Sequence, residues 1–178
     1  MDKSAAILIN GGIGVVATDT IYGIIGCALN QATVERIYVV KRRTPTKPFI
    51  ILIADIGDIT RFGIALDDHV KAILEKYWPG PVSIILECDN PDLAYLHRGT
   101  KSLAFRMPAK PELQTLLQQT GPLVAPSANP EGFEPAATIT EAKSYFGDTV
   151  DFYQEGIVTG RASKIIRITD GDEEIIRA

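Results

Sequence analysis

The sequence predicts a single α/β domain that covers residues 1–178. Its length suits one domain, and its 46% of apolar residues is enough for a hydrophobic core. Short apolar runs of strand length alternate along the chain with segments whose apolar residues recur at helical spacing. The sequence contains no internal repeat, linker or low-complexity segment that would divide the chain.

Strands are expected where a short apolar run is bounded by turn-forming residues. The run at 49–54 is apolar throughout, which predicts a strand buried on both faces. The expected strands are 13–17, 24–28, 49–54, 82–87, 103–107, 122–125, 150–153, 165–169 and 174–177. A turn at 169–172 is expected to join the last two as a hairpin, and residues 88–100 are expected to form a loop.

Helices are expected where helical spacing begins at a capping residue. Ser4 is expected to cap the first helix, and Pro111 lies in the first turn of a later one. Thr138 or Thr140 is expected to cap the last. The expected helices are 4–10, 32–41, 57–62, 67–77, 111–120 and a final one that ends at 146.

Composition and charge limit the possible functions. A net charge of −4 and a pI near 5.2 argue against a general nucleic-acid binder, which usually carries a basic face. The chain has no run of about 18 apolar residues that would span a membrane, and its first residues do not match a secretory signal. Cys27 and Cys88 lie inside apolar runs, where buried free thiols are expected. These features predict a cytoplasmic protein.

A dense basic cluster interrupts this acidic chain. Four of the 18 basic residues, Lys41, Arg42, Arg43 and Lys47, lie within seven positions. The dipole of the expected helix 32–41 favours cations at its C-terminus, which accounts for one or two of them. It does not account for Lys47, which lies in a stiff segment between two prolines. We interpret the cluster as the binding site of an anion, specifically a nucleoside triphosphate.

Three further segments place polar side chains beside expected strands. Thr18-Asp19-Thr20 follows a strand directly, where it either caps the next element or binds a ligand. Arg106 lies among apolar neighbours and either points outward or is buried against an anion. The loop 126–132 is rich in small donors, and it is either a simple turn or a site for phosphate or carboxylate.

Several familiar catalytic arrangements are missing from the sequence. His69 and His97 have no Cys or carboxylate at metal-ligand spacing, so no protein metal site is predicted. The chain has no Gly-x-Ser-x-Gly elbow and no P-loop. The run Gly12-Ile13-Gly14-Val15-Val16-Ala17 matches a dinucleotide-binding fingerprint by its letters, but its glycines precede a strand instead of following one. Chemistry must therefore depend on orientation and on charge stabilisation by Arg, Lys and polar loops.

Five short segments, taken in order, resemble the YrdC family of threonylcarbamoyl-adenylate synthases. They are Thr18-Asp19-Thr20-Ile21-Tyr22-Gly23, Lys41-x-Arg43 with Lys47-Pro48, Trp78-Pro79-Gly80-Pro81-Val82, Phe105-Arg106-Met107-Pro108 and Pro126-Ser127-Ala128-Asn129-Pro130. The resemblance implies a YrdC-like α/β fold, a twisted mixed sheet with flanking helices around a large positively charged cavity. It also implies a nucleotidyltransferase that converts L-threonine, bicarbonate (or CO2) and ATP into threonylcarbamoyl-AMP and pyrophosphate.

The resemblance implies roles for the residues that match the family's motifs. Lys41 and Arg43 would be the catalytic cations. ATP, with Mg²⁺, would be bound by Lys41, Arg43, Lys47, Ser102, Asn129 and Arg177. Threonine would be bound by Thr20, Arg106, Ser127 and Ser163. The product would pass to proteins that modify adenosine 37 of tRNA, and double-stranded RNA or tRNA is a further expected partner.

The chain departs from the family pattern at two positions. Ala17 replaces the proline that usually precedes the threonine-rich motif, and Lys164 follows Ser163 where many members have threonine. Lys47 is typical of short, single-domain members. Two alternatives remain open: an RNA-binding or maturation factor of the same fold, and carbamoyl-adenylate chemistry like that of the related domain in hydrogenase maturation proteins. The acidic pI opposes the first, and the absence of fused domains opposes the second.

Overall fold

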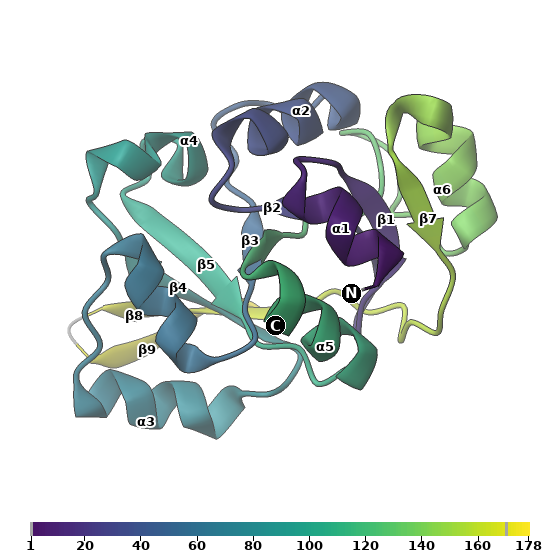
Figure 1. The fold of residues 1–178 in the computed structure, drawn as a ribbon. Helices are drawn as coiled ribbons and strands as arrows, with labels where there is room; N and C mark the ends of the chain where they lie inside the picture. The colour runs from purple at the N-terminus through teal and green to yellow at the C-terminus, as the bar shows by residue number, and fades with distance from the viewer. Residues whose placement is uncertain (1, 170) are drawn as a thin grey trace.

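The computed structural model describes residues 2–169 and 171–178, so Met1 and Asp170 lie outside the described part (Figure 1). The described strands form one continuous sheet in the order β7-β1-β2-β6-β3-β5-β4-β8-β9. Their bounds are β1 Gly14–Ala17, β2 Tyr22–Cys27, β3 Ile50–Leu52, β4 Val82–Glu87, β5 Ser102–Arg106, β6 Leu123–Val124, β7 Phe152–Gln154, β8 Lys164–Thr169 and β9 Asp172–Arg177.

The sheet is mixed, as the family resemblance implied. Parallel pairs join β1 with β7, β3 with β5 and β4 with β8. The other neighbours run antiparallel, among them β4 with β5 and β8 with β9. Both edge strands, β7 and β9, come from the C-terminal part of the chain: β7 pairs with β1, and β9 pairs with β8.

Helices flank the sheet along its length (Figure 1). The α-helices are α1 Lys3–Ile9, α2 Gln31–Lys41, α3 Asp68–Tyr77, α4 Ala94–His97, α5 Pro111–Thr120 and α6 Ile139–Phe146. Short 3₁₀ helices are η1 Ile56–Phe62, η2 Pro91–Leu93 and η3 Gly147–Thr149. None of the helices in the described part of the chain is long and apolar enough to cross a membrane.

Two hydrophobic clusters hold these layers together. Helices α1 and α5 lie side by side and bury Leu8 and Leu117 against Val16, Ile25 and Leu52 of the sheet (Figure 1). A larger cluster packs α2, α3 and α6 against the rest of the strands. Burial of this kind contributes about 25 cal/mol for each Å² of apolar surface, which makes it the main stabilising term.

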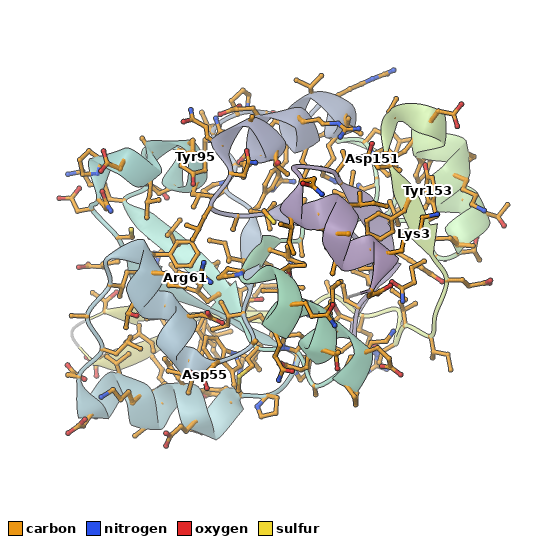
Figure 2. All side chains as sticks on the ribbon, viewed as in Figure 1. Lys3, Asp55, Arg61, Tyr95, Asp151 and Tyr153 are labelled. Atoms are coloured by element: carbon orange, nitrogen blue, oxygen red, sulfur yellow. The ribbon has the colours of Figure 1, made fainter. Side chains whose placement is uncertain are left out.

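Long-range polar contacts fix the edge of the sheet where the chain begins. The carboxylate of Asp151, which Figure 2 labels, accepts a 2.7 Å hydrogen bond from Ile13 N and pairs with Arg36 of α2 at 2.7 Å. Hydrogen bonds from Arg36 are the main reason that the pKa of Asp151 lies below its usual value. One carboxylate thus joins α2 to the start of β1 and to the segment before β7.

Two expectations about local structure need correction. Asp2, not Ser4, caps α1, because the Asp2 carboxylate accepts from Ser4 N. Residues 88–100 are not only a loop. The Asn90 side chain accepts from Asp92 N and Pro91 lies in the first turn, so the same residues that signal a turn start η2 and then α4. Thr138 is the cap of α6, and the expected turn at 169–172 includes Asp170, which lies outside the described residues.

Both cysteines are free thiols, as expected. Cys88 is buried, whereas Cys27 is only partly buried at the end of β2. Desolvation raises the pKa of the Cys27 thiol, so that it stays protonated and unreactive near neutral pH. The expectation of burial therefore holds fully for Cys88 and partly for Cys27.

Candidate functional site

A cavity of about 450 Å³ opens on one face of the sheet. Its walls carry four arginines, Arg43, Arg106, Arg167 and Arg177, and no described residue that lines it is Asp or Glu. The remaining lining residues are small, polar or apolar: Thr18, Thr20, Ile21, Gly23, Pro48, Phe49, Ile50, Ile85, Thr100, Ser102, Ala104, Ala125, Pro126, Ser127, Pro135, Ala162, Ser163 and Ile165. An acidic protein thus has a strongly cationic cavity, which favours an anionic ligand.

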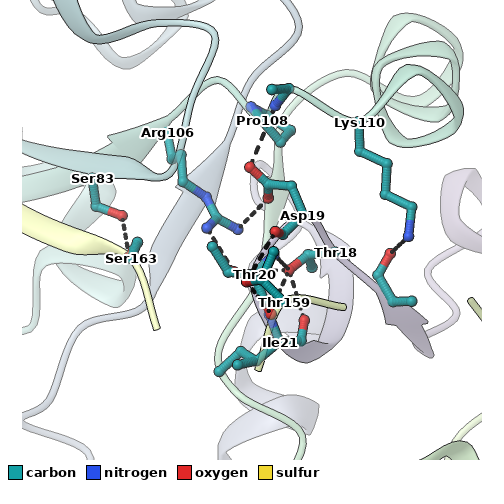
Figure 3. A network of polar contacts seen from close by, with 12 residues as sticks. Thr18, Asp19, Thr20, Ile21, Ser83, Arg106, Pro108, Lys110, Thr159 and Ser163 are labelled. Atoms are coloured by element: carbon teal, nitrogen blue, oxygen red, sulfur yellow. Dashed lines mark hydrogen bonds and ion pairs between the residues drawn. The ribbon is translucent and has the colours of Figure 1, made fainter. Parts of the chain in front are cut away.

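Arg106 lies at the end of β5 and is almost fully buried. Its Nη1 donates a 2.8 Å hydrogen bond to Thr20 Oγ1, and its Nη2 lies 3.3 Å from Asp19 Oδ1 (Figure 3). Burial lowers the pKa of Arg106, while Asp19 opposes that shift and Arg177 adds to it. The structure therefore decides between the two alternatives: the guanidinium is buried against an anion, and that anion is Asp19.

The loop between β1 and β2 is held rigid from both sides. Thr18 Oγ1 accepts from Thr20 N at 3.1 Å and from Ile21 N at 3.2 Å. The Thr20 carbonyl accepts from Gly160 N at 2.9 Å and from Thr159 Oγ1 at 3.1 Å (Figure 3). This segment closes its own turn, which confirms the first alternative, and Thr18 and Thr20 also line the cavity, so ligand binding there stays a prediction.

Arg43 reaches the cavity because α2 ends one residue earlier in a left-handed turn at Arg42, whose φ is 49°. Arg43 Nε donates to the Lys47 carbonyl at 3.2 Å, and its guanidinium lies 5.4 Å from the centre of the Phe49 ring. Phe49 stacks on Tyr38 with ring centres 4.1 Å apart, and Arg98 lies over the other face of Tyr38 at 4.0 Å. A column of two rings and two guanidinium groups therefore positions Arg43.

Lys41 lies behind the cavity wall and does not line it. Its side chain is 1% exposed, and Nζ donates to the carbonyl oxygens of Ser127 and Asn129. Burial, with Arg43 nearby, lowers the pKa of Lys41 to about 7. The Ser127 hydroxyl, which does line the cavity, donates to Asn129 Oδ1 at 2.6 Å. Lys41 therefore holds the loop that presents Ser127.

Lys47 also lies outside the cavity lining. It forms an ion pair with Glu131, which in addition accepts from the Thr44 hydroxyl at 2.9 Å. The hydrogen bond from Lys47, followed by those from Thr44, lowers the pKa of Glu131 to about 2. The members of the basic cluster therefore differ in position. Arg43 lines the cavity. Lys41 joins α2 to Ser127 and Asn129, and Lys47 joins the segment 44–48 to Glu131 in the same loop.

Arg177 enters the cavity from the edge strand β9. A register shift in the β8–β9 pairing places Ile175 opposite Ile166 and Arg177 opposite Ile165, so Ile176 is the extra residue of a bulge. Arg177 Nε and Nη2 both donate to the Ser163 carbonyl, at 3.0 and 2.6 Å. The Ser163 and Ser83 hydroxyls lie 2.9 Å apart (Figure 3). Ser102, at the start of β5, lines the same cavity.

Comparison with known proteins identifies the family. The family model of Sua5, YciO and YrdC proteins, described as "Telomere recombination", matches residues 6–178. The chain belongs to this family. The resemblance found in the sequence is therefore confirmed. Among curated relatives, the threonylcarbamoyl-AMP synthase of Marinobacter nauticus is 33% identical over 92% of this chain and 88% of its own length. That of Nitrosococcus oceani is 34% identical over 95% of this chain and 92% of its own length.

Solved structures of the Sua5/YciO/YrdC family have the same fold. The Sua5 protein of P. abyssi, solved in complex with L-threonine, superposes with a TM-score of 0.89 at 26% identity, over 98% of this chain. This chain spans about half of that protein's length, since it covers 52% of it. YciO of E. coli superposes with a TM-score of 0.85 at 22% identity, over 98% of this chain and 86% of its own, which supports the fold alone.

The structure brings together most of the site residues predicted from the family motifs. Seven of them line the cavity: Thr20, Arg43, Ser102, Arg106, Ser127, Ser163 and Arg177. Lys41, Lys47 and Asn129 support the wall instead. Sequence reasoning missed Asp19 as the partner of Arg106, and it missed Arg167. A signal for Arg167 was available, because alternation within the expected strand 165–169 places it with Ile165 and opposite the buried Ile166 and Ile168.

Proposed function

We propose that this chain is a threonylcarbamoyl-AMP synthase, which joins L-threonine, bicarbonate and ATP and releases pyrophosphate. The observation that carries the proposal is the cavity with four arginines and no carboxylate among its described lining residues. ATP and bicarbonate are anions and threonine carries a carboxylate, and gathering negative groups away from water is unfavourable unless cations are already in place. The names of the curated relatives support the same reaction.

The reaction needs no nucleophile from the protein. Bicarbonate yields CO2 and hydroxide, and the threonine ammonium loses a proton to solvent to become a free amine. The amine attacks CO2, and the nitrogen gives up a second proton to the hydroxide, which leaves a carbamate and water. A carbamate oxygen then attacks the α-phosphorus of ATP. The bond from the α-phosphorus to the bridging oxygen breaks, and pyrophosphate leaves with the electron pair. The protein contributes orientation and preorganised positive charge, which are established sources of rate acceleration.

We assign the threonine end of the site to the region around Arg106. Arg106 Nε is buried and has no hydrogen-bond partner among the described residues. A substrate carboxylate would satisfy this donor, and a planar guanidinium can bind a carboxylate through two parallel hydrogen bonds. We assign Thr20, Ser127 and Ser163, which line the same cavity, to the rest of threonine, with Thr20 fixed by the hydrogen bond from Arg106.

We assign the nucleotide end of the cavity to Arg43, Ser102 and Arg177. Lys47 and Asn129 support the wall of the cavity at that end. Arg43 is the strongest candidate for the phosphates, because it lines the cavity and its nearest described partners are neutral carbonyls. Mg²⁺ would enter with ATP as part of the substrate, where it would neutralise phosphate charge. Lys41 acts indirectly by holding the Ser127 loop.

In a cell the reactive adenylate would need an acceptor, and we infer that proteins modifying tRNA adenosine 37 receive it in the cytoplasm. The synthase activity itself can be tested without them. Purified protein is incubated with MgATP, bicarbonate and either threonine or serine, and the products are analysed by mass spectrometry. A threonine-dependent adenylate of the expected mass, with equimolar pyrophosphate, is the expected result. Pyrophosphate release that does not depend on an amino acid and bicarbonate would overturn the proposal.

A further inference from the structure

The cavity floor contains an apolar strip that runs across four strands and ends at Arg167. Register pairs align Ile50 of β3 with Ala104 of β5, Ala104 with Ile85 of β4, and Ile85 with Arg167 of β8. All four residues line the cavity. Three strand spacings separate β3 from β8, which corresponds to about 14 Å. An extended nucleoside triphosphate can span such a strip.

The two ends of the strip differ in their surroundings. At the β3 end, Arg43 packs over Phe49, the residue before Ile50, and the Thr20 loop and Ser127 line the cavity too. That polar end suits the triphosphate and threonine, which must meet at the α-phosphorus. The nucleoside is then directed along Ala104 and Ile85, whose apolar side chains suit the face of a purine.

Arg167 is the arginine of the cavity that the protein holds least firmly. Arg106 is paired with Asp19 and Thr20, and Arg177 is bound through two nitrogens to the Ser163 carbonyl. The only ion pair recorded for Arg167 within the described residues is with Glu174, at 3.8 Å, which is too long for a hydrogen bond. The Arg167 side chain is 45% exposed, so separating this pair costs little.

We propose that Arg167 binds the purine of ATP by laying its guanidinium over the face of the base. A guanidinium is planar and weakly hydrated, and it stacks on aromatic rings, which an ammonium does less well. Glu174 is the resting partner, and the base replaces it when the nucleotide enters. This assignment rests on the proposed function and adds to it a residue that none of the sequence motifs included.

The test compares the affinities of AMP and ATP for the wild-type protein and for Arg167→Gln, measured by calorimetry. Loss of one stacked cation is expected to weaken both nucleotides by the same factor, about five-fold. Arg167→Lys is expected to recover only part of the lost nucleotide affinity. Unchanged AMP affinity in Arg167→Gln, or a loss confined to ATP, would overturn the proposal, the latter because it indicates a phosphate contact.

Glu174→Gln is the matched control, because it removes the charge of Glu174, which lies opposite Arg167 in the β8–β9 pairing. If Arg167 binds the base, this variant keeps wild-type AMP affinity or gains slightly. If the pair only stabilises the hairpin, both variants lose affinity equally, and the proposal is wrong. If the wild-type protein makes the adenylate and Arg167→Gln keeps wild-type nucleotide affinity, this inference alone is overturned. If the wild-type protein binds neither AMP nor ATP, the proposed function is overturned as well.

Discussion

The guanidinium of Arg106 and the carboxylate of Asp19 lie 3.3 Å apart, with side chains that are only 5% and 11% exposed. Such a pair is costly to break, because removing one member leaves the other buried without a counter-charge. Arg106 also lines the cavity, so we expect stability and substrate binding to depend on the same contact.

Asp19→Ala is therefore expected to lower the free energy of unfolding by about 3 kcal/mol, measured by urea denaturation. Threonine affinity should fall as well, because Arg106 loses one of its two fixed contacts. Asp68→Ala is the matched control, since Asp68 is fully exposed and its ion pair with Lys71 should contribute little. Equal effects of the two substitutions would show that the buried pair does not have this role.

Arg43→Ala is expected to abolish most threonine-dependent pyrophosphate release while the protein remains folded. One charge-assisted hydrogen bond to phosphate contributes about 1.5–3 kcal/mol, which corresponds to a loss of roughly ten- to a hundred-fold in kcat/KM for ATP. Arg42→Ala serves as the control, because Arg42 is exposed and does not line the cavity. Turnover that survives Arg43→Ala unaltered would remove Arg43 from the site.

Lys41 should make stability depend on pH. Its pKa is lowered from 10.5 to about 7 in the folded protein, so between these values the unfolded chain binds more protons than the folded one. Stability therefore rises with pH across this window. Lys41→Met removes the titrating group, and its unfolding free energy should show a smaller rise from pH 7 to pH 10. Parallel pH profiles for the two proteins would refute this reading of Lys41.

Arg98 lies at the far end of the stacked column and should influence Arg43 only through the rings. Arg98→Gln is expected to lower the free energy of unfolding by about 1 kcal/mol and to raise KM for ATP with little change in kcat. Glu35→Gln removes the ion pair between Glu35 and Arg98 but leaves the stack intact. If Glu35→Gln raises KM as much as Arg98→Gln does, the ion pair is responsible and not the column.

The sequence alone indicated where most strands and helices lie, because burial patterns and capping residues are local properties. Strand 82–87 and helix 111–120 were predicted with their observed bounds. The family motifs also identified seven of the residues that now line the cavity. The segment 88–100 was mistaken for a plain loop, since an Asn-Pro pair signals both a turn and a helix start.

Only the tertiary structure decided which basic side chains line the cavity. Lys41 shares the buried side of α2 with Val34, Ile37 and Tyr38. Its ammonium therefore reaches the loop that carries Ser127 and Asn129 instead of the cavity. Arg177 faces inward because of a bulge, and Arg167 ends a row that crosses β3, β5, β4 and β8. Local sequence determines which segments fold into strands and which side chains alternate. Register and pairing between distant strands determine which charges meet, because those contacts depend on residues far apart in the chain.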